Sequence, residues 1–234
     1  WEQSLGQSVF EQYTANRKLV DSQAANAGLE KLTMPLLQSI PDRRYNFKVY
    51  IVRDPSINAF ALPGGYMVLN TGLIEAVGSA DELLGVVAHE CAHVTQQHGL
   101  RKLIDSLGLY LIVKAFLGAK TDLLGGIIEN GAFLLNQQFS RYFEREADET
   151  GFEYMMNAHL NPGGLILFFQ RLEAERKKSG TSNAAETLSF LSTHPAPSSR
   201  IEYLHNKWQE TASRMPGTTR NLEIEFNALR NAIK

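Results

Sequence analysis

Cysteine pairs, long apolar runs and an excess of charge of one sign are all missing from this sequence. Cys91 is the only cysteine among 234 residues, so an internal disulfide is excluded and the redox compartment stays undetermined. No apolar run reaches the roughly 18 residues of a membrane-spanning helix, so we expect none. The formal net charge is -2, which is not the basic field of a nucleic-acid-binding protein, and we expect no nucleic-acid partner.

The spacing of apolar residues predicts a mainly helical chain with one small sheet. Residues 1–40 have helical spacing and should form two helices. Residues 47–51 alternate apolar and polar side chains, and residues 57–62 and 66–70 are two further extended runs. Pro63-Gly64-Gly65 is a strong turn signal between the last two runs. We therefore predict an α+β, mainly α, fold with an antiparallel three-stranded sheet.

Two apolar segments, residues 107–117 and 123–135, are interrupted by charged residues and glycines. Buried helices are one interpretation of the region 103–139. The other is a mobile helical hairpin that covers a cleft or makes peripheral contact with a membrane surface. The sequence leaves both interpretations open.

The central motif is H-E-x-x-H, formed by His89, Glu90 and His93. The apolar residues around it predict a buried helix over residues 79–99, with a capping box that starts at Ser79 and with Gly99 as its C-terminal end. Positions i and i+4 of a helix share one face, so both imidazoles can bind one metal ion. Zinc favours such ligands, and a carboxylate beside zinc can take a proton from water.

A catalytic zinc site generally has three protein ligands, so a third ligand is required. Glu144 and Asp148 stand one helical turn apart on a charged segment, and Arg141 lies one turn before Glu144. A carboxylate there can be the third ligand, and its neighbour can orient a ligand imidazole. Charged helices also carry this spacing for solubility alone, so the spacing by itself does not distinguish a metal ligand from a solvated helix face.

Four blocks carry a resemblance to a known family. In chain order they are NAFALPGG (residues 58–65), the H-E-x-x-H motif, SRYFEREAD (residues 140–148), and His194-Pro195 followed by Arg200. Over residues 45–205 they resemble the zinc metalloprotease family of the CAAX prenyl protease and HtpX, and within it the soluble BepA-like branch. The resemblance implies a zincin-type fold with the H-E-x-x-H helix in its core. It also implies one Zn2+ per chain and endopeptidase activity on unfolded or misassembled proteins.

The resemblance implies roles for individual residues as well. Three of them would bind zinc, namely His89, His93 and Glu144. Two would act in catalysis, namely Glu90 as the general base and His194 facing the metal across the cleft. Three would support the site, namely Asp148 as the carboxylate that orients a ligand, and Arg141 and Arg200 as structural partners of nearby carboxylates or carbonyls.

The expected organisation is one metalloprotease domain over residues 1–234. N-terminal helices (1–44) and a C-terminal helix (220–234) would pack on a catalytic core (45–211). The resemblance implies a bacterial periplasmic or envelope location. The chain begins at Trp1 without an initiator Met or an apolar leader, so we expect a mature or trimmed form from which any export signal has been removed.

Two roles stay open for His194. It could donate to the oxyanion during the reaction, or it could occupy the open position of zinc as a fourth ligand and keep the enzyme latent. An exposed strand edge at Asn58, Ala59, Phe60 and Ala61 is expected to bind an extended peptide substrate, although a plain structural hairpin would have the same sequence.

Two rival functions also stay open. A binding or chaperone module would use the metal only structurally. An exopeptidase would need a carboxylate or arginine that captures a peptide terminus, and the sequence identifies none. His98 and His159 are interpreted as structural or surface residues, because nothing in the sequence pairs with them.

Overall fold

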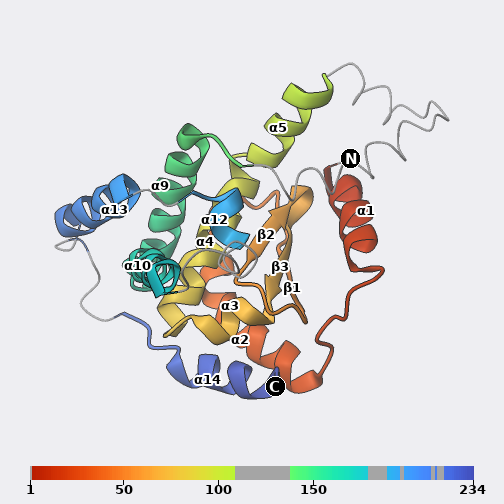
Figure 1. Cartoon of the computed structure of the whole chain (residues 1–234), viewed down its shortest axis with the longest axis horizontal. Helices are drawn as coiled ribbons and strands as arrows, with labels where there is room; N and C mark the ends of the chain where they lie inside the picture. Colours follow the sequence, from red (N-terminus) through yellow and green to blue (C-terminus); the bar gives the residue numbers. More distant parts are fainter. Residues whose placement is uncertain (1, 109–137, 179–188, 196–197, 212–213, 215–218) are drawn as a thin grey trace.

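The computed structural model describes residues 2–108, 138–178, 189–195, 198–211, 214 and 219–234. These residues form helices around one three-stranded sheet (Figure 1). The strands are β1 (Lys48–Val52), β2 (Ala59–Leu62) and β3 (Tyr66–Asn70), with a 3-10 turn η1 (Pro63–Gly65) between the last two. The helices are α1 (Glu2–Thr14), α2 (Gln23–Ser39), α3 (Thr71–Ala76), α4 (Ala80–Thr95), α5 (His98–Leu107), α9 (Arg141–Asn157), α10 (Gly164–Lys178), α12 (Ser189–Thr193), α13 (Ser198–Thr211) and α14 (Glu223–Ala232).

The mainly helical α+β fold is confirmed by this arrangement. Of the predicted apolar segments, residues 109–117 and 123–135 lie outside the described residues, and so does the membrane contact suggested for them. Each described helix is too short or too polar to cross a membrane.

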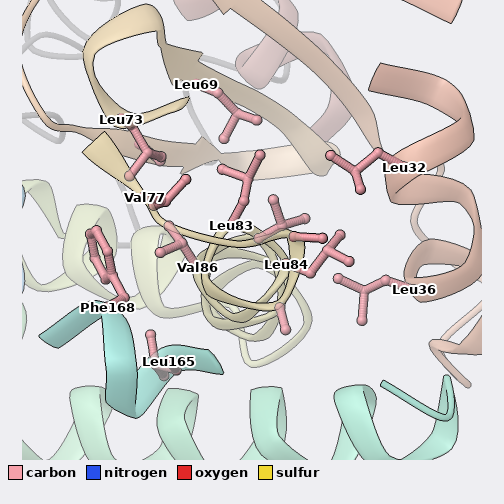
Figure 2. Packing of buried hydrophobic residues seen from close by; sticks show 14 of the residues in the cluster. Leu32, Leu36, Leu69, Leu73, Val77, Leu83, Leu84, Val86, Leu165 and Phe168 are labelled. Carbon is pink, nitrogen blue, oxygen red and sulfur yellow. The ribbon is translucent and has the colours of Figure 1, made fainter. Parts of the chain in front are cut away.

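Helix α4, which carries the H-E-x-x-H motif, lies at the centre of the hydrophobic core. All of its residues except Asp81 are buried, and α2, α9, α10, α14 and strand β2 pack around it. Figure 2 shows the apolar shell near its N-terminal half, where Leu84 lies toward Leu32 and Leu36 of α2 and Leu83 lies toward Leu69 of β3. Burying one such side chain stabilises the fold by roughly 1.5–3 kcal/mol. The predicted core position of this helix is confirmed.

The N-terminus of α4 is capped as predicted, with one difference. The Ser79 hydroxyl accepts a hydrogen bond from the backbone N–H of Glu82 at 3.2 Å. The Glu82 carboxylate accepts a hydrogen bond from the backbone N–H of Gly78, whereas a capping box would use the N–H of Ser79. The same carboxylate forms a bidentate ion pair with Arg171 of α10 at 2.7 and 2.9 Å. The cap therefore ties α4 to α10.

The C-terminus of α4 differs from the prediction. The helix ends at Thr95 because Gln97 adopts the left-handed conformation (φ 57°) that terminates a helix. Gly99, predicted to end the helix, lies inside α5 instead. His98 is the first residue of α5, so the break redirects its side chain.

The sheet has the strand order β1-β3-β2. Strands β2 and β3 form the predicted antiparallel hairpin, in which Gly64 (φ 76°) and Gly65 (φ 91°) supply the left-handed turn residues. Strand β1 is parallel to β3, so the prediction of a wholly antiparallel sheet was wrong. All five residues of β3 are buried, and this apolar strand takes the centre, which separates β1 from β2.

Each face of the sheet packs on helices. Met67 and Leu69 of β3 belong to the main core around α4, whereas Val68 packs with Val9 and Phe10 of α1 in a second apolar cluster. Strand β2 is left at the edge of the sheet, beside α4.

Helix α9 approaches α4 through a glycine. A Cβ atom added at Gly151 would lie 3.0 Å from the carbonyl carbon of Ala88 and from the backbone nitrogen of His89. Side chains rarely allow so close a contact, so a residue with a Cβ would push the two helices apart. The close approach sets the distance from α9 to the motif histidines.

Replacing Gly151 with alanine should lower the free energy of unfolding by about 1–3 kcal/mol, because the added methyl group overpacks the interface. Gly99→Ala is the matched control, since an added Cβ there meets nothing within 4 Å. That change should raise stability by about 0.5–1 kcal/mol. Thermal unfolding of both variants tests this, and equal melting temperatures would contradict the packing argument.

Candidate metal centre

Four buried side chains converge on one point in the core. His89 and His93 come from α4, Glu144 from α9, and His194 from the bend after α12. One nitrogen or oxygen atom from each side chain lies within 4.8 Å of all the others. We call these four residues the ligand cluster.

The spacing of the ligand cluster suits zinc. Nε2 of His89 lies 3.0 Å from Nε2 of His93 and 3.3 Å from Nδ1 of His194. Oε1 of Glu144 lies 3.4 Å from Nε2 of His93 and 2.9 Å from Nδ1 of His194. Tetrahedral bonds of about 2.0–2.1 Å, as zinc makes to these atoms, separate the ligand atoms by about 3.3 Å. The donor types and their distances therefore fit this metal.

Local sequence places Glu144 correctly on α9. The Ser140 hydroxyl caps the helix by accepting from the backbone N–H of Phe143 at 3.2 Å. Glu144 and Asp148 then share the face that meets α4, and both are buried. Oδ1 of Asp148 lies 3.0 Å from Nδ1 of His89, on the far side of the ring from the ligand cluster.

Arg200 of α13 holds both of these carboxylates. Its guanidinium donates to the two oxygens of Asp148 at 2.8 and 2.7 Å and to Oε2 of Glu144. Arg141, predicted to share this role, is exposed at the start of α9 and forms no ion pair with any described residue. Arg200 already occupies the carboxylate oxygens that Arg141 would need.

Glu90 lies beside the ligand cluster and contacts the sheet. Its Oε2 accepts a hydrogen bond from the backbone N–H of Ala61 at 3.0 Å. Its Oε1 lies 3.4 Å from Nε2 of His194 and has no hydrogen-bond partner among the described residues. Burial is the main cause that raises the pKa of Glu90 above its usual value.

Three members of the ligand cluster, His93, Glu144 and His194, have perturbed pKa values. Burial lowers the pKa of His93, which keeps its ring neutral with a lone pair for a metal. Burial acts to raise the pKa of Glu144, but the neighbouring imidazoles, first among them that of His194, outweigh it and hold this pKa below the usual range. For His194, burial acts to lower the pKa, and the carboxylates of Glu144 and Glu90 raise it overall.

Sequence reasoning missed two residues near the site. His98, interpreted as unpaired, is buried and lies 3.0 Å from both His93 and Glu146. The Nζ atom of Lys102 is buried without a hydrogen-bond partner among the described residues, and burial lowers its pKa to about 8. Both residues lie on α5, whose direction depends on the helix break that the sequence did not reveal. His159 is exposed, as interpreted.

A small cavity opens beside the cluster along the strand edge. It is lined by residues of β2, α4, α5 and the bend after α12, among them Ala61, Glu90, Lys102 and His194. An extended chain on the β2 edge would therefore pass Glu90.

Comparison with known proteins identifies related sequences. Residues 23–207 match peptidase family M48. The chain is 30% identical to a putative beta-barrel assembly-enhancing protease of Vibrio cholerae over 206 residues (84% of this chain, 42% of the relative). It is 34% identical to the mitochondrial metalloendopeptidase OMA1 of Schizosaccharomyces pombe over 159 residues (66% of this chain, 44% of the relative). It is also 27% identical to the beta-barrel assembly-enhancing protease of Escherichia coli over 221 residues (88% of this chain, 43% of the relative).

The chain thus spans less than half the length of these curated relatives. The family match covers α2, the sheet, the H-E-x-x-H helix, α9 and most of α13. It confirms the resemblance drawn from the four sequence blocks. This chain belongs to peptidase family M48.

Proposed function

We propose that this chain is a zinc-dependent endopeptidase that hydrolyses peptide bonds in unfolded or misassembled proteins. The single observation that carries this proposal is the buried ligand cluster, with spacing that suits zinc and with Glu90 beside it. Three buried imidazoles and a carboxylate would be costly in a core without a role. Membership of a peptidase family supports hydrolysis as that role.

His89, His93 and Glu144 would hold the metal. When bound, zinc supplies a Lewis acid that polarises a carbonyl oxygen and lowers the pKa of bound water towards about 7. Glu90 would take a proton from the attacking water on Oε1, which accepts no hydrogen bond from any described residue, and pass it to the leaving amine. Its raised pKa suits a group that must both accept and return a proton.

The substrate would bind along the edge of β2. Alternate residues of a strand direct their backbone groups to opposite edges. The N–H of Ala61 points to Glu90, away from β3, so the backbone of Ala59 faces the same edge. Asn58 and Ala61 are part-exposed at this edge, whereas Ala59 and Phe60 are buried, so the edge is less exposed than the sequence predicted. Main-chain hydrogen bonds there would hold an extended peptide with little regard to sequence, which favours unfolded segments as substrates.

His194 would keep the enzyme latent as a fourth zinc ligand. Its Nδ1 lies 3.3 Å from Nε2 of His89 and 2.9 Å from Oε1 of Glu144, which are the separations expected within one coordination shell. A full shell leaves no position for substrate. Movement of the bend after α12 would withdraw His194 and open that position.

A bacterial envelope location and a single domain over residues 1–234 are part of the same proposal. Two relatives are named for the enhancement of β-barrel assembly, which supports proteins of the envelope as substrates. Contact between α14 and α2, and one continuous apolar cluster from Val20 to Ile233, support the single domain. A mitochondrial relative also exists, so a test of location would use cell fractionation of the native source.

Glu90→Gln should retain zinc and lose proteolysis of denatured casein by about 100- to 10,000-fold, because the amide cannot take a proton from water. Metal analysis and a casein digest measure the two effects. Glutamine still accepts from Ala61, so the fold should be kept. Full activity in this variant would remove Glu90 from the mechanism. Because the wild type is proposed to be latent, the variant that decides is His194→Ala: a zinc-loaded His194→Ala protein that stays inert on casein would favour a binding module instead.

His194→Ala should digest casein faster than the wild type, since the fourth ligand is removed while the other three remain. The zinc content should stay at one ion per chain, because three protein ligands suffice to hold a catalytic zinc. Slower digestion by the zinc-loaded variant would contradict latency and would support the alternative role of His194 as a donor to the oxyanion.

A further inference from the structure

His98 is a fully buried histidine that the proposed mechanism leaves unused. It begins α5, directly after the left-handed residue Gln97. Its Nδ1 lies 3.0 Å from Nδ1 of His93, and its Nε2 lies 3.0 Å from Oε2 of Glu146. His98 therefore lies directly behind one imidazole of the ligand cluster.

Only one arrangement of protons satisfies these contacts when His93 binds a metal. Nε2 of His93 faces the ligand cluster, so its lone pair must be free and its proton must reside on Nδ1. That N–H can donate only if Nδ1 of His98 is an acceptor. The proton of a neutral His98 then lies on Nε2 and is donated to the Glu146 carboxylate. The hydrogen bonds run in one direction, from His93 through His98 to Glu146.

Packing holds the His98 ring in this orientation. Phe143 of α9 stacks on it, with ring centroids 4.3 Å apart and an interplanar angle of 16°. The His93 ring meets it edge to face at 4.9 Å. A rotation about the Cβ–Cγ bond that turns the His98 ring out of this plane would break the stack on Phe143 and both hydrogen bonds.

The two motif histidines are therefore supported by the same helix in different ways. Asp148 of α9 contacts Nδ1 of His89 directly at 3.0 Å. Glu146, also on α9, reaches His93 only through His98. A carboxylate behind a metal-binding imidazole fixes its tautomer and its direction.

We propose that His98 is a positioning residue that, together with Glu146, fixes the tautomer and ring direction of His93 for zinc. The inference rests on the proposed function, because it requires His93 to be a zinc ligand. It adds a supporting pair that lies outside the H-E-x-x-H motif and outside the ligand cluster.

Two conservative substitutions separate positioning from mere packing. The side-chain oxygen of asparagine lies near the place of the histidine Nδ1, whereas glutamine reaches only the place of Nε2. His98→Asn should keep an acceptor for His93 but lose the contact with Glu146, so it should bind Zn2+ at most about tenfold more weakly than the wild type. His98→Gln should bind Zn2+ about 10- to 100-fold more weakly. Competition of the full chain with a chromophoric chelator measures both affinities.

Glu146 provides an independent variant with a matched control. It is part-exposed, so Glu146→Gln should fold. That variant should bind Zn2+ about tenfold more weakly, since the acceptor for His98 loses its charge. The control is Glu149→Gln on the same helix, where the carboxylate pairs with Arg145 at 3.1 Å, away from the ligand cluster. It should leave the Zn2+ affinity unchanged.

The outcomes are distinct. A weaker affinity in His98→Gln and Glu146→Gln, with His98→Asn closer to the wild type than His98→Gln and with equal melting temperatures of the zinc-free proteins, supports positioning. Wild-type affinity in His98→Gln, or equal losses in Glu146→Gln and Glu149→Gln, overturns it. If the zinc-free His98 variants do not fold, the two glutamate variants decide. A wild-type chain that binds no Zn2+ would refute the metal centre itself.

Discussion

The approach of α9 to α4 at Gly151 is the constraint on which the rest of the site depends. The glycine lets one helix backbone lie against the other beside His89. From that distance three carboxylates of α9 reach the motif: Glu144 joins the ligand cluster, Asp148 contacts His89, and Glu146 reaches His93 through His98. A wider spacing would leave buried imidazoles and carboxylates without partners, which costs free energy in a core.

Charge in this core is balanced by an arginine from a distant part of the chain. Arg200 of α13 is buried and pairs with Glu144 and Asp148. An unpaired buried carboxylate is strongly destabilising, whereas a hydrogen-bonded ion pair offsets much of that cost. The ion pairs also leave Oε1 of Glu144 directed towards the imidazoles. Arg200 thus neutralises the carboxylates and at the same time sets which oxygen faces the metal position.

The sheet is joined to the same centre through Glu90. Because the apolar strand β3 takes the middle, β2 is left at the edge, where the N–H of Ala61 reaches the Glu90 carboxylate. This hydrogen bond therefore fixes the position of the proposed general base relative to the strand edge. A peptide bound along that edge would have its main chain beside Glu90. Its pairing with the strand would then determine which peptide bond lies at the proposed general base.

The sequence by itself determined the features that depend on residues close in the chain. Helical periodicity placed the H-E-x-x-H helix in the core, the cap at Ser79 set its start, and the spacing of Glu144 and Asp148 put both on one face. The tertiary structure decided what depends on contacts between distant residues: the parallel pairing of β1 with β3, the choice of Arg200 over Arg141, and the contact of His98 with Glu146. Spacing along a helix is fixed by its local geometry, whereas these pairings depend on how separate elements pack, which no short stretch of sequence encodes.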